Sequence, residues 1–480
     1  MKKVLRAYKK TVSIVNETAI WMYENLGSDR VGFLMESNEK ESGKYTFMGV
    51  DPQSLVQSQK DGLVITENNG NVTKLKGNPL VLLKEYFSSF EVHSDETQDE
   101  FNGGLVGSLG YDFIRYTENL PDDNEDEIGI ETIQLMLALK FIAIDHMAET
   151  VTAVVLDEDN EEGKKRALAE AEKLIDEART PGNENKKSCE IKNHHDGVII
   201  KKSDTLEQYS EKVNKIKEYI KEGHIFQTVL SQRWTIQTKQ TGFDLYKQLR
   251  VLNPSPYLYY YNFGKFEIIG SSPEMIVKQT GNNVYTCPIA GTRKRGKDEQ
   301  EDQQLIDDLL KDEKELAEHN MLVDLGRNDL GRISKFNSVH VASYMDILKF
   351  SKVIHIASIV SSEIKEKYDA LDAVDALLPA GTLSGAPKIR ACQIINQLEQ
   401  NKRGIYGGAI GYLDFTGNMD LCIGIRLAYK RNNEISICSG AGIVYDSVPE
   451  NEYQECLNKA GAVVEAIKMA DGGIDYDSTH

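Results

Sequence analysis

Two pairs of glutamates are spaced so that they could hold a metal ion. Glu315 and Glu318 lie three residues apart in KELAEHNM, and Glu452 and Glu455 lie three apart in ENEYQECLNKA. Residues three apart on a helix share a face, so each pair directs two carboxylates to one place. An exposed helix face is the ordinary explanation of either pair alone. The second pair, however, follows the glycine-rich apolar segment SICSGAGIVYD, where an exposed face is less expected.

If the four carboxylates meet, a cation has to offset their mutual repulsion. Oxygen ligands without a cysteine or a pair of histidines suit Mg²⁺ better than zinc. A di-iron site is an alternative because His319 follows Glu318 directly, but such sites need a four-helix bundle and the neighbouring segments predict strands. We therefore expect a Mg²⁺ site formed by Glu315, Glu318, Glu452 and Glu455.

Three further motifs invite an interpretation as anion sites. Gly291 to Asp298 approximates the phosphate-binding pattern GxxxxGK[ST], but an aspartate stands where a hydroxyl is needed, and the segment GGLVGSLGYD does not give GxGxxG. We reject both as nucleotide sites. The segment TLSGAPK, Thr382 to Lys388, places Pro387 at the first turn of a predicted helix. It is either a plain capping turn or an anion site at that helix N-terminus, and its spacing favours neither.

The composition excludes several classes of protein. The chain has 480 residues and, with 56 Lys+Arg against 75 Asp+Glu, a formal charge of −19, which disfavours a nucleic-acid partner. Its 40% hydrophobic and 27% charged residues are typical of a globular protein. No run approaches the roughly 20 apolar residues that span a membrane, and no signal peptide is evident. The six cysteines form no CxxC pair. We expect a soluble cytoplasmic protein with reduced thiols.

The chain divides near residues 160–200. Before this region, segments such as LVITE, NVTKLK and ETVTAVVLD alternate in polarity and predict strands. The stretch from Asp157 to Asp196 is highly charged and predicts a helix that ends in a polar linker.

The second half predicts a mixture of helices and antiparallel strands. Ser203 is expected to cap a helix that ends at Gly223, and further helices are expected near 299–324, 369–378, 387–400 and 449–471. Short polar turns at 415–418 and 431–433 predict hairpins between the intervening strands. The fold class is therefore α+β, without a regular βαβ pattern.

Long motifs along nearly the whole chain are shared with one family. They include FLMES, GKYTFMGVDP, EGHIFQTVLSQRW, NPSPYLYYY, SSPEM, CPIAGTRKRG, HIASIVSSE, PAGTLSGAPK, GIYGGAIGYLDF and CIGIRLA. The chain resembles the chorismate-utilising enzymes, and within them the large components of anthranilate synthase. The resemblance implies an α+β fold of two packed, largely antiparallel β-sheets flanked by helices. It also implies a β-rich regulatory domain over 1–160, a charged helix and linker over 161–200, and a chorismate-binding catalytic domain over 201–472.

The resemblance further implies an activity and a site. The family's enzymes use Mg²⁺ to add ammonia at C2 of chorismate with loss of the C4 hydroxyl, then eliminate pyruvate to leave anthranilate, the first committed step of tryptophan biosynthesis. By position, Glu274 would be the general acid, His355 would assist the elimination, and the four glutamates would hold Mg²⁺ against the ring carboxylate. The residues that would bind substrate are Gly291, Thr292 (also placed at the catalytic centre), Thr382, Tyr406, Arg426, Gly440, Gly442 and Lys459.

Two positions separate branches of the family. Gln227 stands where water-using relatives carry a lysine that activates water, and an amide cannot act as such a base. Ala290, in PIAGT, stands where aminodeoxychorismate synthases carry a nucleophilic lysine. Both positions favour ammonia as the nucleophile and anthranilate as the product.

The resemblance also implies a partner and an inhibitor. None of the cysteines lies in the glycine-flanked turn expected of a glutaminase nucleophile, so a separate glutamine amidotransferase subunit would supply ammonia from glutamine. Tryptophan would inhibit by binding at Glu36, Ser37, Pro256, Tyr257, Leu258, Tyr412 and Cys422. Leu258 departs from the methionine expected in NPSPYM, and His224 departs from an expected aspartate.

Two other functions remain open on the sequence. A relative in the same fold could stop at 2-amino-2-deoxyisochorismate without releasing pyruvate. A non-catalytic subunit could bind tryptophan and leave chorismate unchanged, although every metal and substrate position of the family is filled here.

Overall fold

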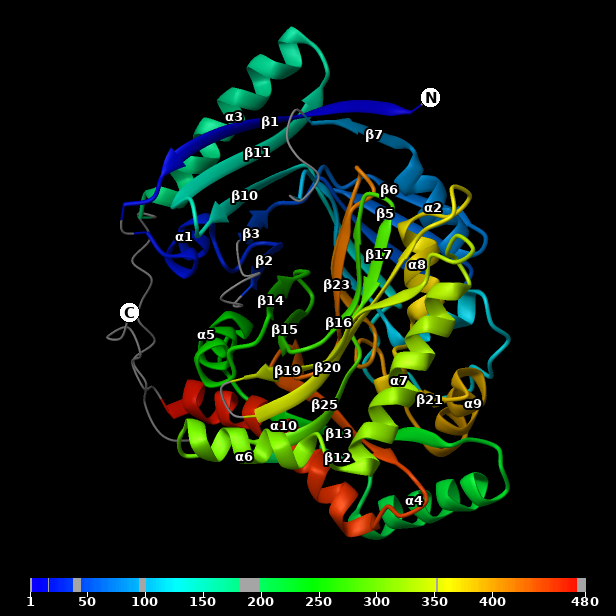
Figure 1. Cartoon of the computed structure of the whole chain (residues 1–480). Coiled ribbons are helices and arrows are strands. Elements are labelled where there is room, and N and C mark those ends of the chain that lie inside the picture. The colour runs from blue at the N-terminus through cyan, green and yellow to red at the C-terminus, as the bar shows by residue number, and fades with distance from the viewer. Residues whose placement is uncertain are drawn as a thin grey trace.

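The computed structural model describes residues 2–15, 17–37, 45–94, 101–181, 198–350 and 353–472. Its framework is two large sheets packed face to face, with helices on both outer faces (Figure 1). Neighbouring strands pair antiparallel, except that β1 and β7 run parallel. The predicted α+β class with two packed, largely antiparallel sheets is confirmed.

Sheet A has 13 strands. In spatial order they are β12 (Val198–Lys202), β13 (Gln227–Gln237), β25 (Glu434–Ile443), β24 (Leu427–Arg431), β15 (Glu267–Ser272), β14 (Tyr257–Asn262), β2 (Gly32–Ser37), β3 (Tyr45–Val50), β10 (Lys140–Asp145), β11 (Thr150–Glu158), β1 (Lys3–Ser13) and β7 (Phe90–His93), with β21 (Gly385–Ala386) paired to β13.

Sheet B has 12 strands. In spatial order they are β18 (Ile289–Lys294), β20 (Val353–Glu363), β17 (Asn283–Thr286), β16 (Met275–Thr280), β23 (Met419–Ile423), β22 (Ala409–Asp414), β8 (Gly104–Leu109), β9 (Ile133–Ala138), β4 (Ser54–Gln59), β5 (Gly62–Glu67) and β6 (Val72–Lys76), with β19 (His340–Lys349) paired to β20.

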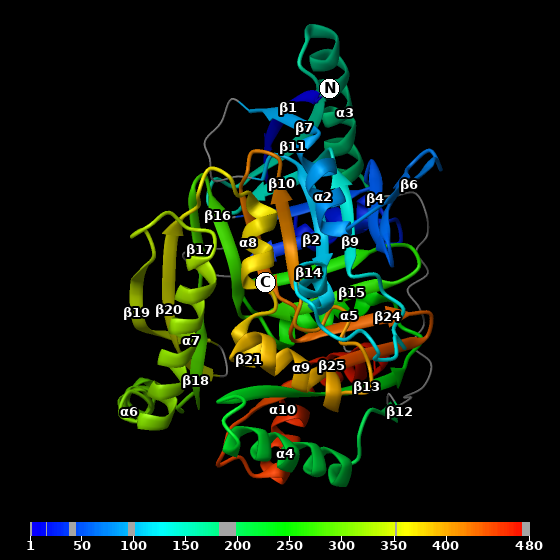
Figure 2. The ribbon, with the colours of Figure 1, turned by 90° about the vertical axis from the view of Figure 1, so that its right-hand side faces the viewer.

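Helices cover the outer faces of both sheets. Those against sheet A are α1 (Ala19–Leu26), α3 (Glu161–Arg179), α4 (Leu206–Lys221), α5 (Gly242–Leu252), α9 (Lys388–Leu398) and α10 (Pro449–Gly472). Those against sheet B are α2 (Pro79–Ser88), α6 (Glu299–Leu309), α7 (Glu313–Gly331) and α8 (Ala370–Leu377). The structure also has the short 3₁₀ segments η1 (Tyr111–Tyr116) and η2 (Gly381–Leu383). Figure 2 shows α7 alongside β18 and β20, with α4 and α10 at the lower end of the molecule.

Side chains alternate between the two faces of each strand, which produces a layered core. On β14, Leu258 and Tyr260 point to the helices outside sheet A, whereas Tyr259 and Tyr261 point to the layer between the sheets. Sheet B contributes Ile410 and other apolar residues to the same middle layer. The strongly apolar sequence of β14 is thus explained by burial of both faces.

The first part of the chain shares both sheets with the second. In sheet A, β14 pairs with β2, for example Tyr257 with Ser37, and in sheet B, β22 pairs with β8, for example Ala409 with Leu109. The predicted helix after residue 160 is α3, and most of the predicted linker lies outside the described residues. The proposed division at 160–200 stays a prediction.

Several predicted boundaries need correction. The helix expected from Ser203 is α4, but its cap is Thr205, whose hydroxyl accepts from the N–H of Gln208 while the Gln208 side chain accepts from the N–H of Thr205. The single helix expected over 299–324 is two helices, because Asp312 caps a new start at Glu313. The end near Gly223, with φ +79°, and the two hairpin turns are confirmed. Among the described residues, none of the helices combines the length and the apolar character needed to cross a bilayer.

Candidate active site

The first carboxylate pair projects from the start of α7. Asp312 accepts hydrogen bonds from the backbone N–H groups of Lys314 and Glu315, which starts the helix just before the pair. Burial raises the pKa of Glu315, and the negative charge of Glu318 raises it further. One counter-charge is present, since Arg293 Nη1 lies 3.4 Å from Glu315 Oε1. The pair therefore holds more negative charge than its surroundings neutralise.

The second pair lies at the start of α10. Burial raises the pKa of Glu452, and the charge of Glu455 raises it further. Lys459, one turn later, places its Nζ 2.7 Å from Glu455 Oε1. The positive charge of Lys314 on α7 lowers the pKa of Glu452, so the starts of α7 and α10 lie near each other. The two predicted pairs are thus brought to the same region.

Gln227 connects the two sides of this region. Its Nε2 donates to Glu318 Oε1 on α7 at 3.1 Å, and its own strand β13 pairs with β25. A Cβ at Gly442 on β25 would lie 2.5 Å from Gln227 Nε2. A side chain at Gly442 would therefore displace the amide that contacts Glu318.

The four predicted carboxylate ligands are of a type that fits Mg²⁺, but their oxygens do not converge on one point in this structure. All four predicted ligands are carboxylates, the type of ligand that Mg²⁺ prefers. Within the described ranges, no three Asp, Glu, His or Cys side chains come close enough together to hold a metal. One carboxylate of each pair instead forms an ion pair: Glu315 with Arg293, and Glu455 with Lys459. The sequence reasoning missed Arg293, although it stands beside Thr292 in the GTRKRG motif.

A β-bulge brings Thr292 and His355 together. In the β18–β20 ladder, Ala290 pairs with Ile356 and Thr292 with His355, so Gly291 is the extra residue, with φ +68°. His355 Nδ1 lies 2.9 Å from the Gly291 carbonyl oxygen and 3.1 Å from Thr292 Oγ1. A carbonyl can only accept, so Nδ1 carries the proton and Nε2 of the neutral ring keeps its lone pair.

The imidazole of His355 is held in its neutral form. Burial lowers its pKa, and the positive charges of Arg426 and Lys459 lower it further, while the bond to the Gly291 carbonyl opposes them. A neutral ring with a free Nε2 can accept a proton at neutral pH. These charge effects also place Arg426 and Lys459 near His355, as the predicted site requires.

Glu274 is a buried carboxyl that is protonated at neutral pH. It lies between β15 and β16 and is 8% exposed. Burial raises its pKa to about 8, although the Thr382 hydroxyl, which donates to Oε1 at 3.0 Å, and the charge of Lys459 both lower it. Because the acid form predominates below that pH, Glu274 can donate a proton.

Polar groups suited to an anion lie close by. Burial disfavours the charged form of the Arg426 guanidinium and so lowers its pKa. The backbone of Arg426 has φ +52°, a conformation that is rare outside glycine. Lys459 Nζ donates to the Gly440 carbonyl oxygen at 3.1 Å. A Cβ at Gly440 would lie 2.9 Å from the hydroxyl of Tyr406, which is buried. The predicted substrate residues therefore share one neighbourhood, with a cationic side that suits a carboxylate ligand.

The TLSGAPK segment has a structural role at its last residue. Lys388 is buried at the start of α9, where its Nζ contacts Asp329 Oδ2 on α7 at 2.7 Å and the Leu377 carbonyl oxygen at 3.0 Å. Asp329 is also buried, so this ion pair fixes α7, α8 and α9 around the segment that carries Thr382. His319 is likewise structural, since its Nε2 is 2.6 Å from Ser358 Oγ in the interior.

The residues expected to bind tryptophan lie on both faces of sheet A. Tyr257 packs in the layer between the sheets and donates to Asp420 Oδ1 at 2.8 Å. Tyr412 and Cys422 from sheet B pack in the same layer. Pro256 precedes Tyr257 and is buried, and Ser37 is the ladder partner of Tyr257.

Glu36 and Leu258 point to the opposite face. They are ladder partners on β2 and β14, and Leu258 packs among the helices outside sheet A. Glu36 is buried and accepts hydrogen bonds from Tyr246 and from Arg250 Nε, the latter at 2.8 Å. The motif residues are neighbours, but the Glu36 carboxylate already has two donors on α5.

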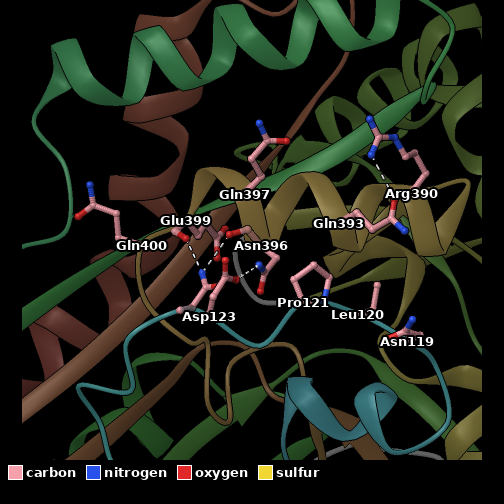
Figure 3. A pocket seen from close by; sticks show the side chains of 11 residues that line it. Asn119, Leu120, Pro121, Asp123, Arg390, Gln393, Asn396, Gln397, Glu399 and Gln400 are labelled. Carbon is pink, nitrogen blue, oxygen red and sulfur yellow. Dashed lines mark hydrogen bonds between the residues drawn. The ribbon is translucent and has the colours of Figure 1, made fainter.

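A surface pocket lies apart from the predicted catalytic, substrate, metal and tryptophan residues. It has a volume of about 790 Å³ and lies between residues 119–124 and α9 (Figure 3). Its polar side chains largely contact one another, as when Asn396 donates to Asp123 at 2.7 Å and Arg390 donates to Gln393 at 3.1 Å. None of the predicted site residues lines it. The chemistry-bearing groups are therefore not at this pocket.

Comparison with known proteins gives a consistent result. Residues 33–465 match a protein family described as chorismate binding enzyme. Anthranilate synthase component 1 of Acetivibrio thermocellus is 43% identical over 462 residues, which cover 95% of this chain and 93% of that protein.

Solved structures agree in fold. Anthranilate synthase component I of Streptococcus pneumoniae superposes with a TM-score of 0.77 at 38% identity, covering 89% of this chain and 93% of that chain. The menaquinone-specific isochorismate synthase of Escherichia coli gives a TM-score of 0.72 at 18% identity, covering 97% and 95%, which is evidence of the shared fold alone.

Proposed function

The chain belongs to the family of chorismate binding enzymes, and we propose that it is the large component of an anthranilate synthase. In this proposal it converts chorismate and ammonia to anthranilate and pyruvate, as a carbon-oxygen lyase. The high identity to proteins named anthranilate synthase component 1, over nearly the whole length, supports this choice of reaction within the family.

The observation that carries the proposal is the protonated Glu274 carboxyl. Loss of the C4 hydroxyl requires a proton, because hydroxide is a poor leaving group. Glu274 is the buried carboxyl whose pKa is raised to about 8, with Thr382 hydrogen-bonded to it and the charge of Lys459 acting on it. A carboxyl held protonated at neutral pH is otherwise unfavourable, so a proton-donating role accounts for its environment.

The second step is assigned to His355. After the amine has been added, removal of the proton at C2 allows the enolpyruvyl group to leave as pyruvate and the ring to become aromatic. His355 Nε2 is the unprotonated nitrogen of a neutral ring whose Nδ1 is held by the Gly291 carbonyl. This geometry supports completion of the reaction over a stop at 2-amino-2-deoxyisochorismate.

Mg²⁺ would be held by Glu315, Glu318, Glu452 and Glu455 and would supply positive charge beside the ring carboxylate of chorismate. Two features support this assignment: the carboxyl-only donor set and the raised pKa values of Glu315 and Glu452. Arg426 and Tyr406 would bind the enolpyruvyl carboxylate, and Gly291, Thr292, Gly440 and Gly442 would line the same site. Thr382 and Lys459 complete it through their action on Glu274.

We also propose the regulation and partner that the relatives' role implies. Ammonia would come from a glutamine amidotransferase subunit, and tryptophan would inhibit at the FLMES and NPSPYLYYY strands, which are neighbours in sheet A. The cytoplasm is the expected location, with neither nucleic acid nor a membrane as partner.

The test is a product assay on the purified chain. With chorismate, Mg²⁺ and excess ammonium salt at mildly alkaline pH, we expect blue-fluorescent anthranilate and an equal amount of pyruvate. Glutamine should replace ammonium only when an amidotransferase subunit is added. A product that retains the enolpyruvyl mass would identify an aminodeoxyisochorismate synthase, and unchanged chorismate with bound tryptophan would identify a sensing subunit.

A further inference from the structure

His319 is the residue through which the start of α7 enters the interior. Of residues 313–319, all of which the structure describes, His319 alone is buried, with an exposed fraction of 0%. Its Nε2 lies 2.6 Å from Ser358 Oγ on β20, and its Nδ1 has no hydrogen-bond partner within the described part of the chain. The imidazole is therefore held by the contact with Ser358, and a buried hydrogen bond of this kind is costly to lose.

A bulge on β19 holds the same hydroxyl from the other side. The register of the β19–β20 ladder shifts so that Tyr344 and Met345 together oppose Ser358. Met345 has φ +58°, and its backbone N–H donates to Ser358 Oγ at 2.9 Å. The hydroxyl of Tyr344 donates at 2.6 Å to Oδ1 of Asn320, the next residue of α7. Both residues of the bulge thus hold α7 at one point, one of them directly and the other through Ser358.

Ser358 and His355 lie on opposite faces of β20. Side chains alternate along a strand, and Ile354 and Ile356 pack with α6 in a small apolar cluster, on the face that Ser358 shares. His355 is on the other face, where it contacts the Gly291 carbonyl oxygen. The bond between His319 and Ser358 therefore lies behind the strand, so it can act on the chemistry only by positioning other groups.

This bond connects two of the proposed functional elements. Glu318 directly precedes His319, and Glu315 lies one turn earlier on α7. His355 lies three residues before Ser358 on β20. Figure 2 shows α7 alongside β20. The helix that carries one pair of proposed ligands is thus joined to the strand of the proposed base close to both.

We propose that the hydrogen bond between His319 and Ser358 fixes the start of α7 against β20 and so keeps Glu315 and Glu318 in register with His355. The inference rests on the function proposed above, and both residues of the bond are positioning residues. A substrate held by its ring carboxylate near the two glutamates presents its C2 proton to His355 Nε2 only if helix and strand keep a fixed separation. Elimination of pyruvate depends on this separation, because His355 is the group assigned to that step.

The first test is hydrogen exchange of Ser358→Ala, measured without metal or chorismate. The substitution removes the hydroxyl that joins His319 to Met345. We expect the backbone amides of residues 317–320 to exchange roughly tenfold faster than in wild type, because loss of a buried hydrogen bond makes local opening easier. The amides of residues 326–330, later in the same helix, should exchange as in wild type.

The second test is the product ratio of the same variant with chorismate, Mg²⁺ and saturating ammonium. We expect anthranilate formation to fall by roughly ten- to a hundredfold, because small displacements of reacting groups have effects of this size. The ratio of released 2-amino-2-deoxyisochorismate to anthranilate should rise, since addition of ammonia does not use His355. A merely structural role would lower the amount of folded protein without changing this ratio.

Ser362→Ala is the matched control. Ser362 is also buried on β20, and its Oγ lies 2.7 Å from Oγ of Ser334, just beyond the end of α7. The variant removes the same kind of contact between the same strand and the far end of the helix. It should change neither the exchange of residues 317–320 nor the product ratio.

Two substitutions of His319 test the bond from the helix side. His319→Leu removes it and replaces Ser358→Ala if that variant does not fold. His319→Gln should show the smaller defect, because its amide nitrogen can still reach the Ser358 hydroxyl. Equal defects in these two variants, or a Ser358→Ala chain with wild-type exchange and product ratio, would overturn the inference. A wild-type chain that forms no anthranilate would instead overturn the proposed function, while the exchange experiment would still decide whether the bond positions α7.

Discussion

At the scale of single residues, burial sets the protonation states of the two groups that we propose as acid and base. Glu274 has its pKa raised to about 8, and His355 has its pKa lowered. The first is thereby an acid and the second a base at the same pH. Opposite shifts in neighbouring groups are typical of acid-base catalysis.

Replacing Glu274 should separate activity from stability. We expect Glu274→Gln to lower kcat by roughly 10²- to 10⁴-fold, because the proton donor is lost. The folded carboxyl binds its proton up to about pH 8, whereas an unfolded glutamate releases it near its ordinary pKa, so its burial destabilises the fold increasingly as pH rises through that window. Glu274→Gln should therefore melt at a higher temperature than wild type at pH 8, as followed by circular dichroism.

Asp414→Asn is the control for this effect. Asp414 is the buried last residue of β22, and burial raises its pKa to about 6. It accepts from the backbone N–H groups of Asn102 and Thr416, outside the site. This variant should keep activity. Comparable activity loss in both variants would mean that Glu274 matters only for folding.

The pH dependence should have two limbs. Activity should fall as pH rises through about 8, where Glu274 loses its proton, and as pH falls below the lowered pKa of His355, where the imidazole gains one. Rates have to be expressed per free ammonia, because its concentration itself rises with pH. A kcat that is flat between pH 7 and pH 9.5 would contradict the role of Glu274.

Sequence spacing and the family motifs pointed to the groups proposed for this chemistry, but not to the residues that contact them. The three-residue spacing pointed to the carboxylate pairs, and the family motif pointed to Glu274 and His355. The contacts of Arg293 with Glu315 and of Gln227 with Glu318 join segments far apart in the chain, and no local pattern encodes them.

At the scale of elements, a bulge and a helix start align the site. Gly291 has φ +68°, and a Cβ there would come within 3.1 Å of Leu309 and 3.4 Å of Glu315 Oε2. We expect Gly291→Ala to reduce kcat at least roughly tenfold, because it strains the bulge that holds His355 and crowds Leu309 behind it. Steady-state kinetics measure this effect.

Gly417→Ala isolates the cost of the backbone conformation. Gly417 also has a positive φ, +97°, but a Cβ there meets nothing within 4 Å. Both variants should lose about 1 kcal/mol of stability, whereas only Gly291→Ala should lose activity. Equal activity in the two variants would show that the bulge at Gly291 does not contribute to catalysis.

Element boundaries were predicted less well than element types. Period-two segments predicted strands such as β5 and β11 correctly, because one face or both are buried. The helix start at Thr205 was missed because Ser203, two residues earlier, is an equally good cap by residue type. The division between α6 and α7 was missed because Asp312 was not recognised as a cap.

At the scale of the whole molecule, neither half of the chain forms a complete sheet by itself. In each sheet, the strands from the first 160 residues form one block and those from residue 198 onward form another, and the two blocks meet at β2–β14 in sheet A and at β8–β22 in sheet B. We expect a fragment of residues 201–472 expressed alone to be aggregated or unfolded, because β14 and β22 would expose unpaired edges and buried apolar faces. Co-expression with residues 1–200 should restore a folded complex. A stable, monomeric 201–472 fragment would contradict this expectation and support an independent catalytic domain.

The most direct test of the central claim is a Mg²⁺ titration of anthranilate formation. Wild type should be inactive with a chelator and regain activity with Mg²⁺, whereas Glu315→Gln should need at least roughly tenfold more Mg²⁺. Glu313→Gln makes the same charge change on an exposed residue of the same helix and should behave as wild type. Activity that persists without Mg²⁺, or identical titrations of the two variants, would contradict a metal site built by the starts of α7 and α10.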